Sequence, residues 1–201
     1  LFVMTVATTG LSEKSAKAAG IAYDKTYTYS GSHASYYPGA SNMSVKVLWD
    51  KTTLKLIGAQ IIGFDGVDKR MDVLATAIRF GAKVTDLTNL ELCYAPPFGS
   101  AKDPVNMAGY VIENMMSGLV KTFHWHDIEK ISKDPNAFLL DTRNPMEYLA
   151  GTIPGFVNIP LDSLRDRLDE IPKDKTIYVT CQIGLRGYIA ARILMQNGYD
   201  V

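Results

Sequence analysis

The first half of the chain mixes two hydrophobic periods. Strand patterns cover residues 1–8, 23–30, 44–50 and 53–63, and a polar turn at 50–53 predicts that the last two strands form a hairpin. Apolar positions three and four residues apart predict a helix over 67–80, and another that begins at Pro104, a residue suited to a first helical turn. Ser12 and Gly20 bound a shorter helix. Strands followed by helices indicate an α+β domain with an antiparallel sheet.

The second half alternates regularly between strands and helices. Strands are predicted at 137–143, 156–160 and 176–180, and helices at 126–131, 145–150, 161–171 and 187–197. This alternation predicts an α/β domain whose parallel sheet is covered on both faces, with 176–180 as the central strand. The change of rhythm divides the chain into a domain at 1–115, a linker at 116–123 and a second domain at 124–201.

Composition narrows the classes of function. The chain has 201 residues, 47% of them hydrophobic, and its 21 basic and 21 acidic residues cancel, so no net field favours nucleic acid or an anionic membrane. The two cysteines, Cys93 and Cys181, lie too far apart for a zinc motif or a disulfide framework, and we expect no metal site. No apolar run reaches the length of a membrane span, and no signal peptide is visible, so we expect a cytoplasmic protein. The chain begins inside a strand pattern without Met and ends where another strand begins, so we expect both ends to be truncated.

The stretch CQIGLR, Cys181 to Arg186, fills the turn between a strand and a helix. Backbone N–H groups at such a turn point into a shared hollow, where they and the helix dipole stabilise a thiolate. Gly184 lets the loop curl, and Arg186 adds a positive charge at its rim. This pattern indicates nucleophilic sulfur chemistry on Cys181. The alternative is a small buried cysteine that only packs.

Five separated blocks of the second half resemble the single-domain rhodanese family. They are D-x-R at 141–143, E-Y at 147–148, G-T-I-P-G from 151, N-I-P from 158 and C-x-x-G-x-R from 181. The resemblance covers residues 124–201 and implies that Cys181 is a persulfide-carrying nucleophile. It also implies that the loop from Gln182 to Arg186, which includes Ile183, Gly184 and Leu185, is the cradle for the transferred sulfur. Asp141, Arg143 and Glu147 would be structural supports near this loop. Related phosphatases place one more residue between their cysteine and arginine, so the shorter loop favours sulfur over phosphate.

The first half resembles another family. The stretch LELCYAPPFGSAKDPVN, together with LIGAQIIG and TVATTGLSEKSAKAAG, is similar to the dimerisation domain of flavin- and nicotinamide-dependent disulfide reductases, in the branch of coenzyme A-disulfide reductases and NADH oxidases. The resemblance covers residues 1–115. It implies a homodimer in which a tyrosine pair reaches the active site of the partner subunit. The matching positions are Tyr94 and, by spacing, Tyr36, although its neighbour Tyr37 is equally available.

Together the resemblances imply a fusion that reduces coenzyme A disulfide, coenzyme A persulfide or polysulfide. FAD, NAD(P)H and coenzyme A would be the cofactors of the longer protein, and none of them would be bound wholly by this chain. For the two dinucleotides the reason is that no G-x-G-x-x-G fingerprint follows a strand here. Sulfur donors and coenzyme A derivatives would be the small-molecule partners. The alternatives are a stand-alone thiosulfate-type sulfurtransferase and a non-catalytic rhodanese-fold interaction module.

The sequence also allows predictions for Cys93, for the histidines and for the dimer interface. Apolar neighbours suggest that Cys93 is buried and only packs. His124 and His126 bracket Trp125 and suit docking or capping better than metal binding. His33 has no assignable role. We expect the dimer interface to include the 94–98 loop and three apolar residues of the helix that begins at Pro104, which are Val105, Val111 and Ile112.

Overall fold

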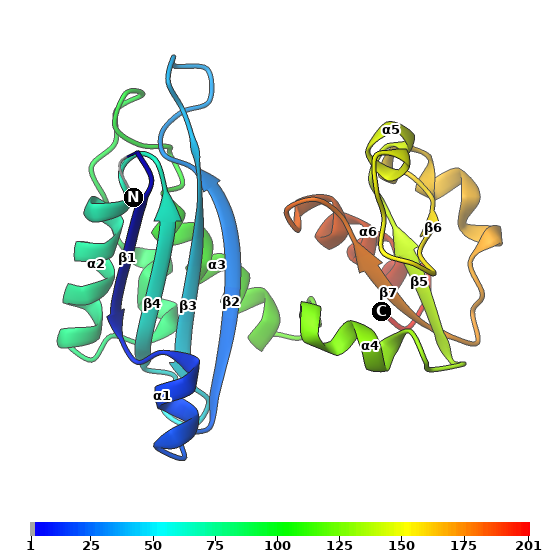
Figure 1. Cartoon of the computed structure of the whole chain (residues 1–201), viewed down its shortest axis with the longest axis horizontal. Coiled ribbons are helices and arrows are strands. Elements are labelled where there is room, and N and C mark those ends of the chain that lie inside the picture. The colour runs from blue at the N-terminus through cyan, green and yellow to red at the C-terminus, as the bar shows by residue number, and fades with distance from the viewer. Residues whose placement is uncertain (1–2) are drawn as a thin grey trace. The chain divides into compact units, whose positions relative to one another are not determined.

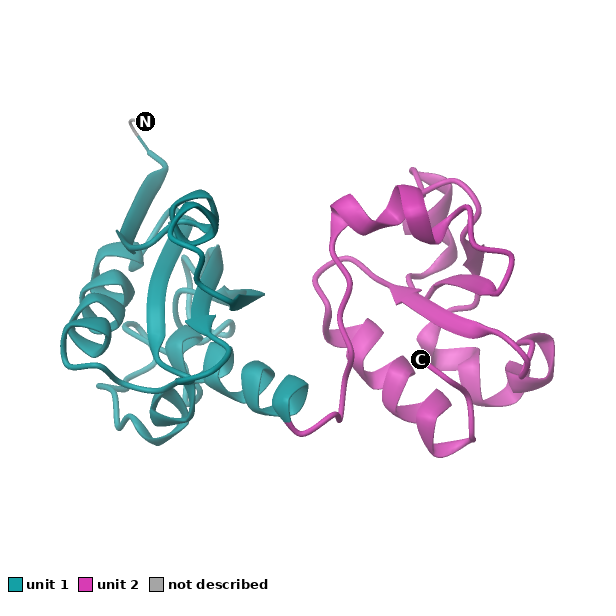
Figure 2. Cartoon of the chain, turned by 90° about the horizontal axis from the view of Figure 1, so that it is seen from below, with its two compact units in different colours: residues 1–116 teal, residues 117–201 magenta. Residues whose placement is uncertain are grey.

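Two compact units make up the chain, Leu1–Met116 and Ser117–Val201, which Figure 2 colours separately. The computed structural model describes residues 3–201. Each unit encloses hydrophobic clusters of its own, one in the first and two in the second. Among the helices that the structure describes, none is long and apolar enough to span a membrane.

The first unit is an antiparallel sheet with helices on one face (Figure 1). Its strands lie in the order β1 (Thr5–Gly10), β4 (Leu56–Gly63), β3 (Asn42–Asp50) and β2 (Tyr23–Gly31). Alternate residues of β3 and β4, such as Val45, Val47 and Ile61, pack against apolar residues of α2 (Val67–Arg79) and α3 (Pro104–Met116). The predicted α+β class is confirmed.

A short helix, α1 (Glu13–Ala18), follows β1 and lies at one end of the sheet (Figure 1). The Ser12 hydroxyl caps it by accepting a hydrogen bond from the Ser15 N–H at 3.1 Å, as the sequence predicted. The first strand begins at Thr5 rather than at residue 1, because Val3 lies in a turn; Leu1 and Phe2 lie outside the described residues.

The helix α3 corrects the predicted dimer interface. Val105 and Ile112 are fully buried in the core of their own unit, so they cannot form an interface between subunits, and that prediction is wrong for both. The apolar stripe of α3 faces the sheet and the 3₁₀-helix η1 (Val84–Asn89), which the sequence did not predict. Gly109 makes this approach possible, because a Cβ there would lie only 2.9 Å from the Cβ of Leu87.

The second unit is a three-stranded parallel sheet between helices. Its strands β5 (Ala137–Asp141), β6 (Val157–Asn158) and β7 (Thr176–Thr180) lie in the order β6-β5-β7. The unit also contains η2 (Trp125–Asp127), α4 (Ile128–Ile131), α5 (Pro145–Leu149), η3 (Leu161–Glu170) and α6 (Leu185–Gln196). Leu139 and Leu140 point into two different hydrophobic clusters, so the sheet is covered on both faces as predicted.

Three details of this unit differ from the prediction. Among the described residues, the middle strand is β5 rather than the predicted 176–180 strand, because β5 pairs with both β6 and β7; an apolar run alone does not determine strand order. Thr176 of β7 forms an isolated parallel bridge with Asp200. The predicted helix at 161–171 is a 3₁₀ segment interrupted at Arg167, and α6 begins at Leu185 rather than at residue 187.

Candidate functional site

The thiol of Cys181 lies directly after β7, in the turn that leads into α6. Gly184 precedes the helix with φ of 100°, a conformation that glycine adopts without strain. The backbone N–H of Gly184 points at the Cys181 Sγ at 3.1 Å, and that of Gly187 at 3.3 Å. Two main-chain donors therefore converge on one sulfur, which is the arrangement that stabilises a sulfur anion.

Gly187 is a site residue that the sequence did not identify. It lies in the first turn of α6, where backbone N–H groups have no partner within the helix and are free to donate to the sulfur. The predicted cradle residues Gln182, Ile183, Gly184 and Leu185 are all exposed around the thiol. Only Gly184 of these four donates to the sulfur among the bonds described, and the cradle role of the other three stays a prediction.

Arg186 is paired with a carboxylate. Its two terminal nitrogens donate to Glu147 of α5 at 2.6 and 2.7 Å. These bonds, with a further one from the backbone of Asn144, hold the pKa of Glu147 at about 2, and the same carboxylate raises the pKa of Arg186. The side chain of Asn144 in turn caps α5 through the Glu147 N–H at 2.9 Å. Arg186 therefore braces the cysteine loop against α5.

A second pair, Asp141 and Arg143, lies beside the thiol. Asp141 is fully buried at the end of β5 and accepts hydrogen bonds from Arg143 at 2.7 to 3.1 Å, which raises the pKa of that guanidinium. Arg143 also donates to the Gly151 carbonyl at 2.8 Å. The pair lines a hollow of about 310 Å³ with Cys181, whose other lining residues are Gly151, Thr152, Ile153 and Thr180. The structure thus gathers all three predicted supports, Asp141, Arg143 and Glu147, around the cysteine loop.

The two predicted tyrosines of the first unit also meet. The hydroxyls of Tyr36 and Tyr94 are 3.3 Å apart, and both side chains are more than half exposed, at 75% and 52%. Tyr37 instead packs edge-on against the ring of His33, at 5.8 Å between centroids. The hydrogen bond that Tyr36 shares with Tyr94 is the main cause of the raised pKa of Tyr36. The pair presents two phenol groups to solvent on one side of this unit.

A buried ion pair lies behind the tyrosines. Arg70 of α2 and Asp103, at the end of the loop that carries Tyr94, are 1% and 3% exposed, and their closest atoms are 2.8 Å apart. The sequence analysis assigned no role to either residue. The sequence did contain a sign that Arg70 is buried, because this charged residue falls on the apolar stripe of α2 between Val67 and Leu74.

The position of Cys93 shows that the prediction of its burial is wrong. It is exposed, not buried, because the loop that contains it turns Cys93 and Tyr94 outward while Leu92 packs against the core. His124 lies at the start of η2, where its backbone N–H donates to Asp127 at 2.8 Å, and its ring stacks on that of His126. Within residues 3–201, no cluster of histidine, cysteine and carboxylate side chains is suited to a metal ion.

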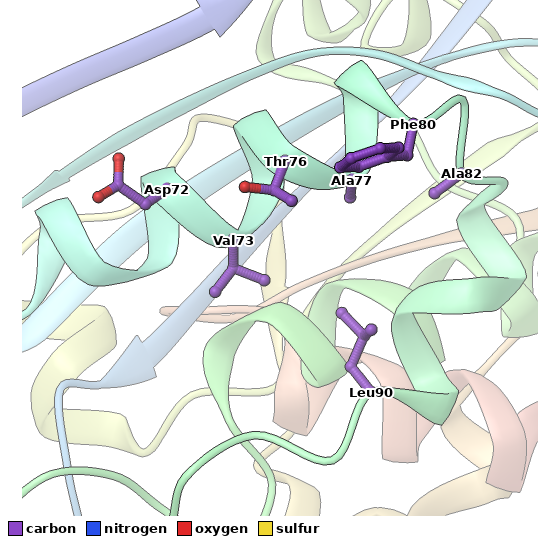
Figure 3. Close-up of a pocket in the computed structure, with 7 residues that line it drawn as sticks. All are labelled: Asp72, Val73, Thr76, Ala77, Phe80, Ala82 and Leu90. Carbon is purple, nitrogen blue, oxygen red and sulfur yellow. The ribbon is translucent and has the colours of Figure 1, made fainter.

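A separate hollow of about 390 Å³ lies between α2 and the segment that follows η1 (Figure 3). Seven residues line it, and the close-up shows Phe80 and Leu90 on opposite sides of it. The lining includes one carboxylate, Asp72, and neither a thiol nor a cation. Its chemistry does not suit a catalytic centre.

Comparisons with known proteins match both units. Residues 2–104 match the dimerisation domain of pyridine nucleotide-disulphide oxidoreductases, and residues 124–201 match the rhodanese-like domain. The coenzyme A disulfide reductase of Staphylococcus epidermidis is 41% identical over 109 residues, which are 54% of this chain and 24% of that protein.

Two solved structures match the whole chain. Reduced Bacillus anthracis CoADR-RHD is 54% identical with a TM-score of 0.96, and a NAD-dependent persulfide reductase from A. fulgidus is 39% identical with a TM-score of 0.89. Each match covers 100% of this chain and 36% of the other, so the chain spans about a third of these relatives. The chain belongs to the pyridine nucleotide-disulphide oxidoreductase family, as its dimerisation domain followed by a rhodanese-like domain.

Proposed function

We propose that this chain is a segment of an FAD- and NAD(P)H-dependent reductase of disulfides and persulfides, acting on coenzyme A disulfide, coenzyme A persulfide or polysulfide. The observation that carries the proposal is the presence of two sites in one chain. A pair of exposed phenols lies in a disulfide-reductase dimerisation domain, and a thiol with two main-chain donors lies in a rhodanese-like domain. Relatives named for coenzyme A disulfide and persulfide reduction match the sequence and the fold.

The cysteine site suits the transfer of sulfane sulfur. The Cys181 thiolate attacks the outer sulfur of a persulfide R–S–S⁻, the S–S bond of the donor breaks, and R–S⁻ leaves. The product is a persulfide anion on Cys181, so the step needs no external oxidant or reductant. The N–H groups of Gly184 and Gly187 donate to the Cys181 sulfur, so they are placed to stabilise the thiolate that attacks the donor.

The tyrosine site suits the reduction step. A phenol donates a hydrogen bond to a sulfur anion without adding charge, and two phenols that share a hydrogen bond can serve a leaving thiolate together. FAD and NAD(P)H would supply the electrons in the longer protein. This chain would bind neither nucleotide as a whole, because no G-x-G-x-x-G follows a strand in it, and other domains of the longer protein would supply the main binding sites.

We further propose that the longer protein is a homodimer in which Tyr36 and Tyr94 complete the active site of the partner subunit. The family match to a dimerisation domain and the outward position of both hydroxyls support this arrangement. In the longer flavoprotein, Tyr94→Phe should lower turnover of coenzyme A disulfide by about ten- to a hundred-fold, the loss of one hydrogen bond to a charged group. Tyr37→Phe is the matched control and should leave turnover unchanged, because Tyr37 packs on His33.

Mixed dimers test the shared site. Subunits that carry Tyr94→Phe are combined with subunits that lack the flavin-proximal cysteine. If the tyrosine acts across the dimer, one site of each mixed dimer holds both lesions and the other is intact, so activity returns. If mixed dimers form and activity does not return, the tyrosine acts within its own subunit and the shared-site proposal fails.

A stand-alone sulfurtransferase is the second candidate. The observation that favours it is that the described residues around Cys181 all come from one compact unit with its own hydrophobic clusters. Transfer of sulfur from thiosulfate to cyanide by this chain alone, at a rate comparable to transfer from low-molecular-weight persulfides, would support it.

A further inference from the structure

The buried guanidinium of Arg70 touches both loops that carry the tyrosines. Its Nη2 donates to the Ser32 carbonyl at 2.7 Å, at the start of the 32–41 loop that contains Tyr36. The same nitrogen contacts the Phe98 carbonyl at 3.5 Å, four residues after Tyr94. Figure 1 shows that these two loops lie at the same end of the sheet, opposite α1. One side chain therefore ties together segments that are far apart in the sequence.

Asp103 completes the anchor. It accepts hydrogen bonds from Arg70 Nε at 3.1 Å and Nη2 at 2.8 Å, and its backbone N–H donates to Asn106 at 3.2 Å. The amide of Asn106 in turn donates to the carbonyls of Leu87 and Leu90. The 90–103 loop is thus held where it begins and where it ends.

The two loops also bond to each other. The Ala34 N–H donates to the Gly99 carbonyl at 3.0 Å, within two residues of the Ser32 and Phe98 carbonyls that Arg70 contacts. Turns then lead to the tyrosines, since Tyr37 N–H bonds to the Ala34 carbonyl and Phe98 N–H to that of Ala95. The tyrosines are therefore held within a few residues of fixed positions.

The surroundings of Arg70 are shaped for a guanidinium. Gly66 has φ of 65°, and a Cβ there would lie only 2.2 Å from Arg70 Nη1, which instead donates to the Gly66 carbonyl at 3.2 Å. A well-packed apolar residue on this stripe would often serve stability equally well. The rigid planar fork of an arginine donates to several acceptors in a fixed geometry, whereas an apolar residue has no donors and a lysine carries its donors on one nitrogen at the end of a flexible stem.

We propose that Arg70 and Asp103 are positioning residues that hold the hydroxyls of Tyr36 and Tyr94 together. The pair sets the relative position of the two loops, and the loops set the distance between the phenols. The proposal rests on the proposed function only for its effect on turnover, because the phenol geometry belongs to this chain alone.

The test measures the coupling between the phenols in the 201-residue chain. With 3-fluorotyrosine placed at position 36, fluorine NMR follows the titration of that phenol with and without Tyr94→Phe. In the wild-type background, Tyr94→Phe should shift the titration to lower pH, because the hydrogen bond between the two hydroxyls raises the pKa of Tyr36. With Arg70→Lys, or with Arg70→Met combined with Asp103→Leu, Tyr94→Phe should have no effect. The double variant removes the fork without leaving a buried charge, so it decides the matter if Arg70→Lys does not fold.

Two further variants sharpen the result. Gly66→Ala displaces the guanidinium without changing any charge and should also abolish the coupling. Glu13→Gln removes the ion pairs with Lys25 and Lys46 at the other end of the sheet and should leave the coupling intact. Coupling that persists in the folded double variant would overturn the proposal, since Arg70 would then serve stability alone.

In the longer flavoprotein, Arg70→Lys should lower turnover roughly ten- to a hundred-fold and should add nothing to Tyr94→Phe. Loss of coupling without loss of turnover would uphold the positioning role and overturn the proposed part of the tyrosines in reduction.

Discussion

The two units build their sites by different means. In the second unit, the thiol and both N–H donors come from one short stretch, with Gly184 and Gly187 three and six positions after Cys181. In the first unit, the phenols are 58 positions apart, and a buried pair with a separation of 33 holds their loops. A strand, a turn and a helix are sufficient to form the cysteine site, whereas the tyrosine site requires the whole first unit to be folded. The cysteine site should therefore respond mainly to local changes, and the tyrosine site to changes in distant anchors.

The largest expected effect is on sulfur transfer. Cys181→Ser should lower transfer from a persulfide to an acceptor thiol by at least about a thousand-fold, because the covalent carrier is lost. Cys93→Ser is the matched control, since Cys93 is the other cysteine and is exposed. Equal losses in the two variants would show that Cys181 is not the carrier.

The second prediction separates the units by stability. Arg70→Met leaves Asp103 buried without its partner, so the free energy of unfolding of the first unit should fall by about 3–5 kcal/mol. Urea denaturation followed by the fluorescence of Trp49, buried in the core of that unit, measures the change. Sulfur transfer by Cys181 should be unchanged under native conditions. A parallel loss of sulfur transfer would contradict the independence of the two sites.

The third prediction concerns the turn at Gly184. Gly184→Ala should destabilise the second unit by about 1–3 kcal/mol, because φ of 100° is strained for alanine although no atom obstructs its Cβ. Sulfur transfer should also slow, since the Gly184 N–H contacts the sulfur. Gly198→Ala is the control, with φ of 80° and an equally open Cβ in the same unit. It should lower the melting temperature similarly and leave sulfur transfer unchanged.

The smallest effect is on the pH dependence of the second unit. The pKa of Glu147 is about 2 in the folded protein, below its ordinary value of 4.5, chiefly because Arg186 donates to it. A lowered folded pKa means that the pair stabilises the fold above about pH 4.5 and that this contribution is lost as the pH falls toward 2. Melting temperatures between pH 6 and pH 2 should therefore fall less steeply for Glu147→Gln than for wild type. Identical slopes would show that the brace does not contribute to stability.

The same contrast explains what the sequence could predict. The cysteine loop could be predicted because its residues are contiguous in the sequence. The structure places the sulfur, Gly184 and the three predicted supports, Asp141, Arg143 and Glu147, close together. The choice between Tyr36 and Tyr37 depended on which ring turns toward a loop 58 positions away, and local pattern contains no such information. The exposure of Cys93 was missed for a related reason, since apolar neighbours do not show which way a loop turns.

Helices and sheets show a similar limit. The apolar stripe of α3 was identified correctly, but the sequence could not say whether it faced its own sheet or another subunit, and the burial of Val105 and Ile112 decides for the sheet. Strand order in the second unit likewise depends on pairing between β5 and both neighbours, not on the apolar character of β7. In the sequence, Arg70 stood out only as a charge on an apolar stripe, because its acceptors Ser32, Phe98 and Asp103 come from two distant loops.

The most direct measurement is the location of transferred sulfur on the chain. The 201-residue protein is treated with glutathione persulfide, its thiols and persulfides are blocked by alkylation, and its peptides are analysed by mass spectrometry. The account predicts one added sulfur atom on Cys181, released when an acceptor thiol is added before alkylation, and the same result for Cys93→Ser. Added sulfur on Cys93 with Cys181 unmodified would contradict it.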